Sequence, residues 1–295
     1  MEKARIAIIG GSGLYQMDGL QDVDEVDLTT PFGKPSDTIT LGKLGNERVA
    51  FLPRHGRGHR IQPSDVPVRA NIFALKTLGV ERIISVSAVG SLRETFEPLD
   101  LVIPHQLIDR TFMRHTTFFE ENVVAHIGFA HPFCPTLSQL LFHAASKTSA
   151  KVHAGATLIV MEGPAFSTKA ESFMYKSWNA DIIGMTALPE AKLAREAEIC
   201  YTTLASVTDY DCWREQTEVV TVDMVISNLL KNTKVAKETL RNLISTIPDG
   251  RNCLCGSALK DAIVTQPAYI PQSFREKMFP ITGKYLKSIT NCHKT

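Results

Sequence analysis

The sequence predicts an α/β protein, a single-domain, three-layer fold in which a mixed, mostly parallel β-sheet is flanked by helices. Two observations carry this prediction. Along residues 3–247, apolar runs typical of buried strands alternate with segments of helical periodicity, the order that produces a parallel sheet with helices on both faces. The composition, 44% hydrophobic and 21% charged over 295 residues, is that of a globular protein able to bury one large core.

The first half of the chain supplies strands more often than helices. Gly45-Asn46 forms the turn of a predicted hairpin, and Gly79 closes a predicted helix. The elements expected here are strands at 3–9, 38–44, 47–52, 82–86 and 100–104, and a helix at 68–78. A long loop then covers 112–133, and loops of this length in a compact domain are usually functional or lie at an interface.

The second half alternates regularly between helix and strand. We expect helices over 135–147, 169–178, 189–198 and 222–247, and strands over 152–161, 181–185 and 199–204. Because no linker or repeat interrupts this pattern, one domain is expected over residues 1–264. Residues 265–295 contain three prolines and are predicted to form a loosely attached tail.

Charge and hydropathy exclude some functions. The net charge of +1 gives no field that would draw the protein to nucleic acid or to a membrane surface. No apolar run is long enough to span a bilayer, and the first residues lead directly into a strand without a signal peptide. A cytoplasmic enzyme is therefore expected, with no nucleic-acid or membrane partner.

The cysteines are expected to be mainly reduced thiols. Four of the six are scattered singly, whereas Cys253 and Cys255 flank Leu254. This pair could be strained, redox-active or part of a metal site, but a zinc site needs two more ligands at suitable spacing and none is near in the sequence. We therefore expect no metal and full activity in chelator; a redox role for the pair and chance spacing stay equally open.

The candidate chemistry lies where apolar strands end. Asp209 and Asp211 follow the buried strand 199–204, at the carboxyl end where open α/β sheets bind ligands. Residues two apart on an extended chain point the same way, so both carboxylates could face one ligand. An aspartate-rich turn is the alternative interpretation.

Two other strand ends suit an anion. Gly10-Gly11-Ser12-Gly13 follows the first strand, and its backbone N–H groups could close on a phosphate, although a plain tight turn explains it equally well. It lacks the Lys-Ser/Thr of a Walker loop and the third glycine of a dinucleotide fingerprint. The stretch 54–60 is dense in cations and glycines and is predicted to bind phosphate or carboxylate.

These motifs, in this order, resemble those of a known family. The matching stretches are Ile8–Leu14, Thr30–Asp37, Arg54–Arg57, Ala70–Ile72, Gly90–Arg93, Glu162–Pro164, Arg195–Ala197 and Thr208–Trp213. Together they resemble the trimeric class of purine nucleoside phosphorylases, and within it most closely the methylthioadenosine phosphorylase subfamily, over residues 3–247. The resemblance implies a nucleoside phosphorylase-like fold and phosphorolysis, in which phosphate attacks the sugar carbon C1′ while the purine leaves. Methylthioadenosine and inorganic phosphate would be the substrates, without a cofactor.

The resemblance also implies roles for individual residues. The phosphate would lie among Ser12, Arg54, His55, Ser87, Ala88 and Thr186. Met185 would lie along the ribose and Phe166 against the purine. The remaining positions that the resemblance assigns to substrate are Ser167, Asp209, Tyr210 and Asp211, with an apolar pocket for the methylthio group at Val222 and Val225 and with His126 reaching in from a neighbouring subunit.

Asp209 would be the general acid toward purine N7. An aspartate titrates near pKa ~3.9, so burial or the charge of Asp211 must raise that value. Asp211 would accept a hydrogen bond from the 6-amino group. The 6-oxopurine members carry Glu and Asn at the positions of Ser167 and Asp209, so the aspartate here favours a 6-aminopurine. A 6-oxopurine or methylthioinosine phosphorylase, and a silent nucleotide-binding module, are the alternatives.

The assembly implied is a homotrimer. The stretch Cys253–Gly256 resembles a form found in prokaryotic members that assemble as hexamers, so a dimer of trimers is the alternative. The sequence assigns no role to residues 265–295.

Overall fold

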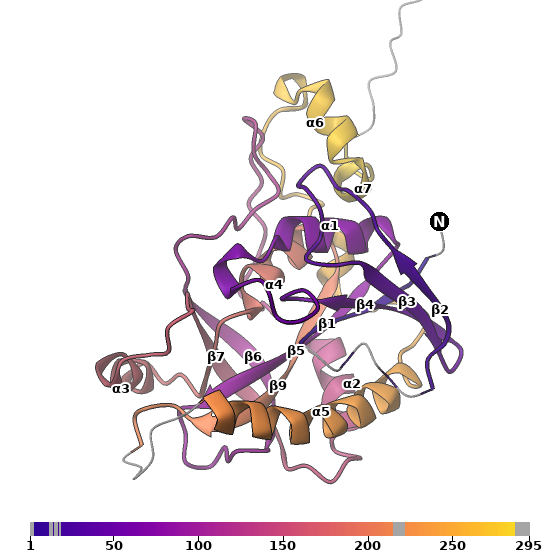
Figure 1. Cartoon of the computed structure of the whole chain (residues 1–295). Coiled ribbons are helices and arrows are strands. Elements are labelled where there is room, and N and C mark those ends of the chain that lie inside the picture. The colour runs from indigo at the N-terminus through magenta and orange to yellow at the C-terminus, as the bar shows by residue number, and fades with distance from the viewer. Residues whose placement is uncertain (1–2, 12–13, 15–16, 18, 215–221, 287–295) are drawn as a thin grey trace, which may run out of the picture.

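The computed structural model describes residues 3–11, 14, 17, 19–214 and 222–286, except for some side chains in the first turns of helix α5. In this part of the chain a nine-stranded mixed sheet has the order β2-β3-β4-β1-β5-β8-β7-β6-β9 (Figure 1). The strands are β1 Ile6–Gly10, β2 Gln21–Val26, β3 Ile39–Leu44, β4 Glu47–Pro53, β5 Arg82–Ser91, β6 Leu101–Arg110, β7 Val152–Met161, β8 Ile182–Gly184 and β9 Cys200–Tyr210. The predicted α/β fold with a mixed sheet between helices is confirmed.

The sheet closes partly on itself. Strand β9 pairs antiparallel with β6 and parallel with β5, so that β5, β8, β7, β6 and β9 form a ring. This closure was not predicted, because the pairing of β5 with β9 joins segments far apart in the sequence, with no local signal. Its consequence is that the carboxyl ends of β5 and β9 lie side by side.

Helices cover the two faces of the sheet (Figure 1). Helices α1 (Val68–Thr77) and α4 (Ala187–Glu196) pack together on one face, and α2 (Pro135–Ala145) and α5 (Val222–Ile244) on the other. Helix α3 (Lys169–Ser177) lies to one side and starts at a capping box, in which Thr168 and Glu171 exchange side-chain and backbone hydrogen bonds.

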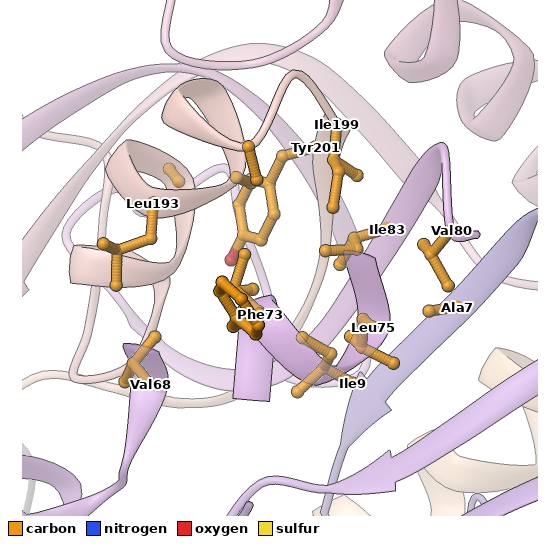
Figure 2. Close-up of a cluster of buried hydrophobic side chains, with 14 of the residues drawn as sticks. Ala7, Ile9, Val68, Phe73, Leu75, Val80, Ile83, Leu193, Ile199 and Tyr201 are labelled. Carbon is orange, nitrogen blue, oxygen red and sulfur yellow. The ribbon is translucent and has the colours of Figure 1, made fainter. Parts of the chain in front are cut away.

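Strand β1 shows why this arrangement is stable. All of its residues are buried, as expected for a strand covered on both faces. Successive side chains point to opposite faces, so Ala7 and Ile9 join the core under α1, and Ile6 and Ile8 join the core under α2 and α5. Figure 2 shows the first of these cores, where Tyr201 also packs.

Some predicted boundaries were wrong. Strand β2 was missed because its sequence is polar and exposed along almost its whole length at the sheet edge. Strands β5, β6 and β9 extend several residues beyond the predicted ends at 86, 104 and 204. Several candidate site residues therefore lie within strands rather than after them.

The predicted loose attachment of the C-terminal segment is wrong for residues 265–286. This segment forms η3 (Pro267–Tyr269), α6 (Gln272–Lys277) and α7 (Phe279–Thr282). Phe274 and Met278 are fully buried, and the Phe274 ring centroid lies 6.0 Å from that of Phe119 in the long loop. The prolines favour a loose tail, but packing on a loop distant in sequence orders the segment. Residues 287–295 lie outside the described part.

No helix in the described residues is long and apolar enough to cross a membrane.

Candidate active site

A bulge at the end of β9 places Asp209. Strands β5 and β9 stay in register as far as Val89 opposite Val207, and then Gly90 pairs with Asp209, so that Thr208 is the extra residue. Thr208 Oγ1 lies 3.2 Å from the Val89 carbonyl oxygen and 2.7 Å from Oδ2 of Asp209. A bulge redirects the side chains that follow it, and here it fixes the direction of Asp209.

Helix α5 supports the bulge from the side. The amide group of Asn228 donates to the Thr208 carbonyl oxygen at 2.7 Å, and that of Asn232 donates to the Val207 carbonyl oxygen at 3.1 Å. The Asn228 bond gives the carbonyl oxygen of the bulged residue a partner, whereas the Val207 carbonyl oxygen also accepts the Leu99 N–H at 2.9 Å. Helix α5 therefore holds the candidate catalytic end of β9, in addition to covering the core.

Gly90 leaves room for the carboxylate. A Cβ atom at this position would lie 3.2 Å from Oδ1 of Asp209 and 3.1 Å from Cγ2 of Ile183. A larger residue would therefore push Asp209 away from β5. The motif Gly90–Arg93, which carried part of the family resemblance, thus has a local physical reason.

The environment of Asp209 favours its protonated form. Burial is the main cause, and the charge of Asp211 adds to it, so that the pKa of Asp209 is raised to about 6 despite the Thr208 hydroxyl, which lowers it. Burial also raises the pKa of Asp211, whose Oδ2 accepts a hydrogen bond from Ser172 of α3 at 2.5 Å. The two carboxylates therefore differ in their anchoring: a threonine of the same strand contacts one, and a helix serine contacts the other.

Two hydroxyl groups meet near the middle of β5. Ser87 Oγ lies 3.0 Å from Oγ1 of Thr186, the residue that precedes the first turn of α4. Ala88 is the next residue of β5. Two hydroxyls that meet in this way can donate to an anion. The backbone here is not a helix N-terminus, because Leu188 has a φ of −117° and a ψ of 138°. Ser87 is three residues from Gly90, which is roughly 10 Å along a strand.

His55 is held in one tautomer. Its Nδ1 lies 2.8 Å from the Ile61 carbonyl oxygen, an acceptor, so Nδ1 carries the proton. Burial first, and then the charge of Arg54, lower the pKa of His55 to about 4. The ring is therefore neutral at pH 7, and its Nε2 is an acceptor. It stacks on His59 with centroids 4.3 Å apart.

Arg54 is engaged within the protein. Its side chain is 3% exposed, and its Nε donates to Oε1 of Glu190 on α4 at 2.5 Å. Its Nη groups donate to the carbonyl oxygens of Ile9 and Val86 and to the hydroxyl of Ser85. The guanidinium fork that the resemblance assigned to phosphate thus links the carboxyl ends of β1 and β4 to the middle of β5, and its charge is balanced by Glu190.

A second buried ion pair, between Arg114 and Glu162, was not predicted from the sequence. Arg114 Nε donates to Oε1 of Glu162 at 2.9 Å, and its Nη1 donates to the carbonyl oxygens of Met185 and Leu188 at 2.6 Å. Burial raises the pKa of Glu162, but hydrogen bonds from Ser64, from backbone N–H groups and from Arg114 outweigh it and lower that pKa to about 2. The pair fixes the segment containing Met185 against the loop after β7.

The residues expected around the base lie on that loop or beside it. Phe166 is 57% exposed, and Ser167 accepts a hydrogen bond at its carbonyl oxygen from Cys212 Sγ at 3.3 Å. Met185 Sδ lies against Gly163, where an added Cβ atom would be 2.7 Å away. This close approach explains the glycine of the Glu162–Pro164 motif.

The Tyr210 side chain does not lie beside that of Asp209. Its side chain is 9% exposed, packs against Trp213, and donates a hydrogen bond to the Glu94 carbonyl oxygen at 3.2 Å. Neighbouring strand residues point to opposite faces, so Tyr210 faces away from the side that Asp209 occupies. The Tyr210 side chain therefore packs inside the protein, which gives its place in the motif a structural reason.

His126 lies far from the Asp209 of its own chain. It is exposed, and its backbone N–H donates to the Ala262 carbonyl oxygen at 2.8 Å. It lines a cleft of about 380 Å³ together with Glu196, which ends α4 at the opposite end from Thr186. Ser12 and the side chains of Val222 and Val225 lie outside the described residues.

The structure also brings four cysteines together. The sulfur atoms of Cys134, Cys200, Cys253 and Cys255 all lie within 4.8 Å of one another. The expectation that the Cys253–Cys255 pair lacks further ligands was wrong, because the missing two come from the start of α2 and the start of β9. Sequence spacing gave no sign of this, since the two partners lie on separate elements far from each other along the chain.

The fold and the site define an enzyme class. A buried carboxyl with a raised pKa at the end of a strand and a pair of hydroxyls that can donate to an anion suit an enzyme that cleaves a nucleoside with phosphate. Residues 5–247 match the sequence profile of the phosphorylase superfamily. The chain belongs to this superfamily and, within it, to the S-methyl-5′-thioadenosine phosphorylase family.

Several relatives are similar to this chain over most of its length. The S-methyl-5′-thioadenosine phosphorylase of Koribacter versatilis is 55% identical over 96% of this chain and 97% of its own length, and that of Chloroflexus aurantiacus is 55% identical over 97% and 99%. The crystal structure of a methylthioadenosine phosphorylase from an Antarctic soil metagenomic library has a TM-score of 0.91 at 49% identity, covering 95% of this chain and 99% of that one. A variant of the Schistosoma mansoni adenosine/methylthioadenosine phosphorylase, solved in complex with methylthioadenosine, has a TM-score of 0.78 at 38% identity, covering 84% and 93%.

Proposed function

We propose that this protein catalyses the phosphorolysis of S-methyl-5′-thioadenosine to adenine and 5-methylthioribose 1-phosphate. The observation that carries the proposal is the buried Asp209, whose pKa is raised to about 6, so that a fraction of the carboxyl is protonated near neutrality. The names of the close relatives and the methylthioadenosine complex of the Schistosoma enzyme support the same substrate.

Cleavage of the C1′–N9 bond develops positive charge on the sugar and negative charge on the purine, and the protein must stabilise both. A phosphate oxygen forms a bond to C1′, and the electron pair of the C1′–N9 bond moves into the purine. Asp209 donates its proton to N7, so that adenine leaves as a neutral molecule. Asp209 is then a carboxylate and recovers its proton from solvent. The reaction uses inorganic phosphate as co-substrate and no cofactor.

The phosphate subsite that we propose centres on Ser87 and Thr186. Their hydroxyls supply donors, while Ala88 and Ser12 contribute backbone or hydroxyl groups by family resemblance. The neutral His55 offers an acceptor at Nε2, which suits a phosphate that still carries one proton. Arg54 acts as a positioning residue in this scheme, because its fork is engaged by Glu190.

The base subsite uses the aspartate pair. Asp211 is held by Ser172 and would accept a hydrogen bond from the 6-amino group of adenine. A 6-oxopurine presents an acceptor there instead and would leave the buried carboxylate unpaired, which disfavours it strongly. Phe166 and Ser167 would border the base, and Met185 the ribose.

In this proposal the pocket for the methylthio group includes a residue from a neighbouring subunit. By family resemblance, Val222 and Val225, three apart at the start of α5, would form the apolar pocket for the 5′ substituent. His126 would complete the pocket of a neighbouring subunit, because it lies away from its own chain's Asp209. We propose a cytoplasmic homotrimer, with a dimer of trimers as the larger alternative.

The test is release of free base from four nucleosides, each with and without phosphate. Methylthioadenosine should react fastest, adenosine more slowly, and both only with phosphate. A faster reaction of inosine or methylthioinosine would contradict the proposed roles of the aspartates and favour a 6-oxopurine phosphorylase. No reaction under any condition would favour a nucleotide-binding module.

A further inference from the structure

Four cysteines meet at the end of β9 that is opposite to Asp209. Cys200 is the first residue of β9, and Cys134 immediately precedes α2. Cys253 and Cys255 flank Leu254 where the C-terminal segment enters η2 (Leu254–Ser257). All but Cys253 are buried, and the cluster joins three distant parts of the chain.

The spacing of the sulfur atoms suits one tetrahedral metal ion. A zinc ion bound to four thiolates at about 2.3 Å holds the sulfur atoms roughly 3.8 Å apart. Here Cys200 and Cys253 Sγ lie 3.3 Å apart, and all four sulfur atoms fall within 4.8 Å. Small side-chain rotations would complete the tetrahedron. A soft, four-thiolate set favours zinc over the hard cations magnesium and calcium.

The charged groups near the cluster include a helix end and two arginines. Cys134 lies at the N-terminus of α2, where the helix dipole favours an anion. Arg82 is the cross-strand neighbour of Cys200, and Arg251 lies two residues before Cys253 with its guanidinium close to Gly256. Both arginines also pair with Glu81, so their charge is balanced locally, and the zinc ion itself would stabilise the thiolates.

Disulfides are the competing chemistry. All four thiols are free in the structure. Pairing Cys253 with Cys255 would close a ring across a single residue, which is strained. Cys200 and Cys253, whose sulfur atoms lie 3.3 Å apart, could pair without such a ring, so the redox state of the thiols decides between a disulfide and a bound ion.

We propose that this cluster is a structural zinc site with four thiolate ligands, Cys134, Cys200, Cys253 and Cys255. Binding releases the thiol protons to solvent and involves no oxidation or reduction. The site lies at the far end of β9 from Asp209, so the ion takes no part in the bond cleavage.

The site would anchor the segment that orders the loop bearing His126. Beyond the cluster, the Ala262 carbonyl oxygen accepts the His126 backbone N–H at 2.8 Å, and Val264 N–H donates to the Val124 carbonyl oxygen at 3.0 Å. Thr265 Oγ1 accepts the Val124 N–H at 2.8 Å. Loss of the ion should therefore loosen this segment and lower thermal stability.

The first measurement is the metal content of the full-length wild type, purified without added metal or chelator, by inductively coupled plasma mass spectrometry. We expect about one zinc per chain. An organomercurial reagent should release it as thiols are titrated, and cobalt exchange should give the thiolate charge-transfer and tetrahedral bands. Metal-free protein with four free or disulfide-bonded cysteines would overturn the proposal, as would bound zinc that survives removal of the thiols.

Two variants assign the ligands. The double variant Cys253→Ser, Cys255→Ser should lose the zinc and melt at a lower temperature, whereas Cys212→Ser, outside the cluster, should keep its zinc. If the double variant does not fold, the wild-type metal content and cobalt spectrum still decide the question. Because the readouts are metal and stability, they are independent of which nucleoside the enzyme cleaves.

Discussion

Arg54 and Glu190 form a buried ion pair that connects the carboxyl ends of β1 and β4 and the middle of β5 to helix α4. The Nε–Oε1 distance is 2.5 Å, and the two side chains are 3% and 1% exposed. Glu190 also accepts a hydrogen bond from the hydroxyl of Tyr201 at 2.9 Å. Because His55 follows Arg54 and Thr186 precedes α4, this pair sets the relative position of two proposed phosphate-binding residues.

We expect Glu190→Ala to destabilise the protein by about 3–5 kcal/mol, because it leaves the Arg54 charge buried without a partner. The free energy of unfolding from urea denaturation measures this. The matched control is Asp27→Ala, which removes the partner of Lys34 in an exposed pair and should cost less than about 1 kcal/mol. Equal losses in the two variants would show that the buried pair contributes no more than a surface pair.

Asp209→Asn should reduce kcat/KM for methylthioadenosine by about 10²–10⁴-fold, the usual contribution of a general acid. An amide cannot donate a proton of comparable acidity to N7, and its volume leaves the bulge unchanged. Phosphate-dependent adenine release measures the loss. If the variant instead keeps or improves the reaction that the wild type prefers, Asp209 is not the general acid, and the 6-oxopurine alternative gains support.

The pH profile should report the protonated carboxyl of Asp209. Activity requires the acid form, so kcat/KM should fall as pH rises above about 6, the raised pKa of this group. Thr208→Val removes the hydroxyl that lowers this pKa, and so should move the falling limb to higher pH. Comparing the two proteins cancels the titration of phosphate itself. An unchanged limb in the variant would show that another group controls it.

His126→Ala should raise KM for methylthioadenosine and change kcat little, because the residue would contact the substrate end of a neighbouring subunit and not the reacting bond. The control is His131→Ala, which alters another exposed histidine of the same loop. Steady-state kinetics with saturating phosphate separates the two parameters. Equal KM values in both variants and the wild type would remove His126 from the site.

Local sequence patterns predicted the local parts of this structure well. The helix predicted over 68–78 is α1, because its apolar spacing and closing Gly79 are local features. Strand β2 and the closure of β5 on β9 were not predictable, since one lacks an apolar face and the other depends on distant pairing.

The candidate site also has residues that the sequence predicted and residues that it did not. Asp209 and Asp211 were found because two carboxylates follow a buried strand. Their supports, Thr208, Ser172 and Asn228, were missed because their roles depend on a bulge and on helices that pack from elsewhere. The cysteine cluster was missed for the same reason, since spatial proximity replaces the sequence spacing by which zinc sites are usually recognised.

The C-terminal segment gives a prediction about stability. Phe274 is fully buried against Phe119, so Phe274→Ala should cost about 3–5 kcal/mol in the free energy of unfolding through lost burial and a cavity. Phe279, five residues on, is 62% exposed, and Phe279→Ala should cost less than about 1 kcal/mol. Urea denaturation of both variants tests the difference. Since the same segment bonds to the loop bearing His126, Phe274→Ala should also raise KM for methylthioadenosine, whereas Phe279→Ala should not. Similar, small losses of stability in the two variants would mean that residues 265–286 are attached loosely after all, as their prolines suggest.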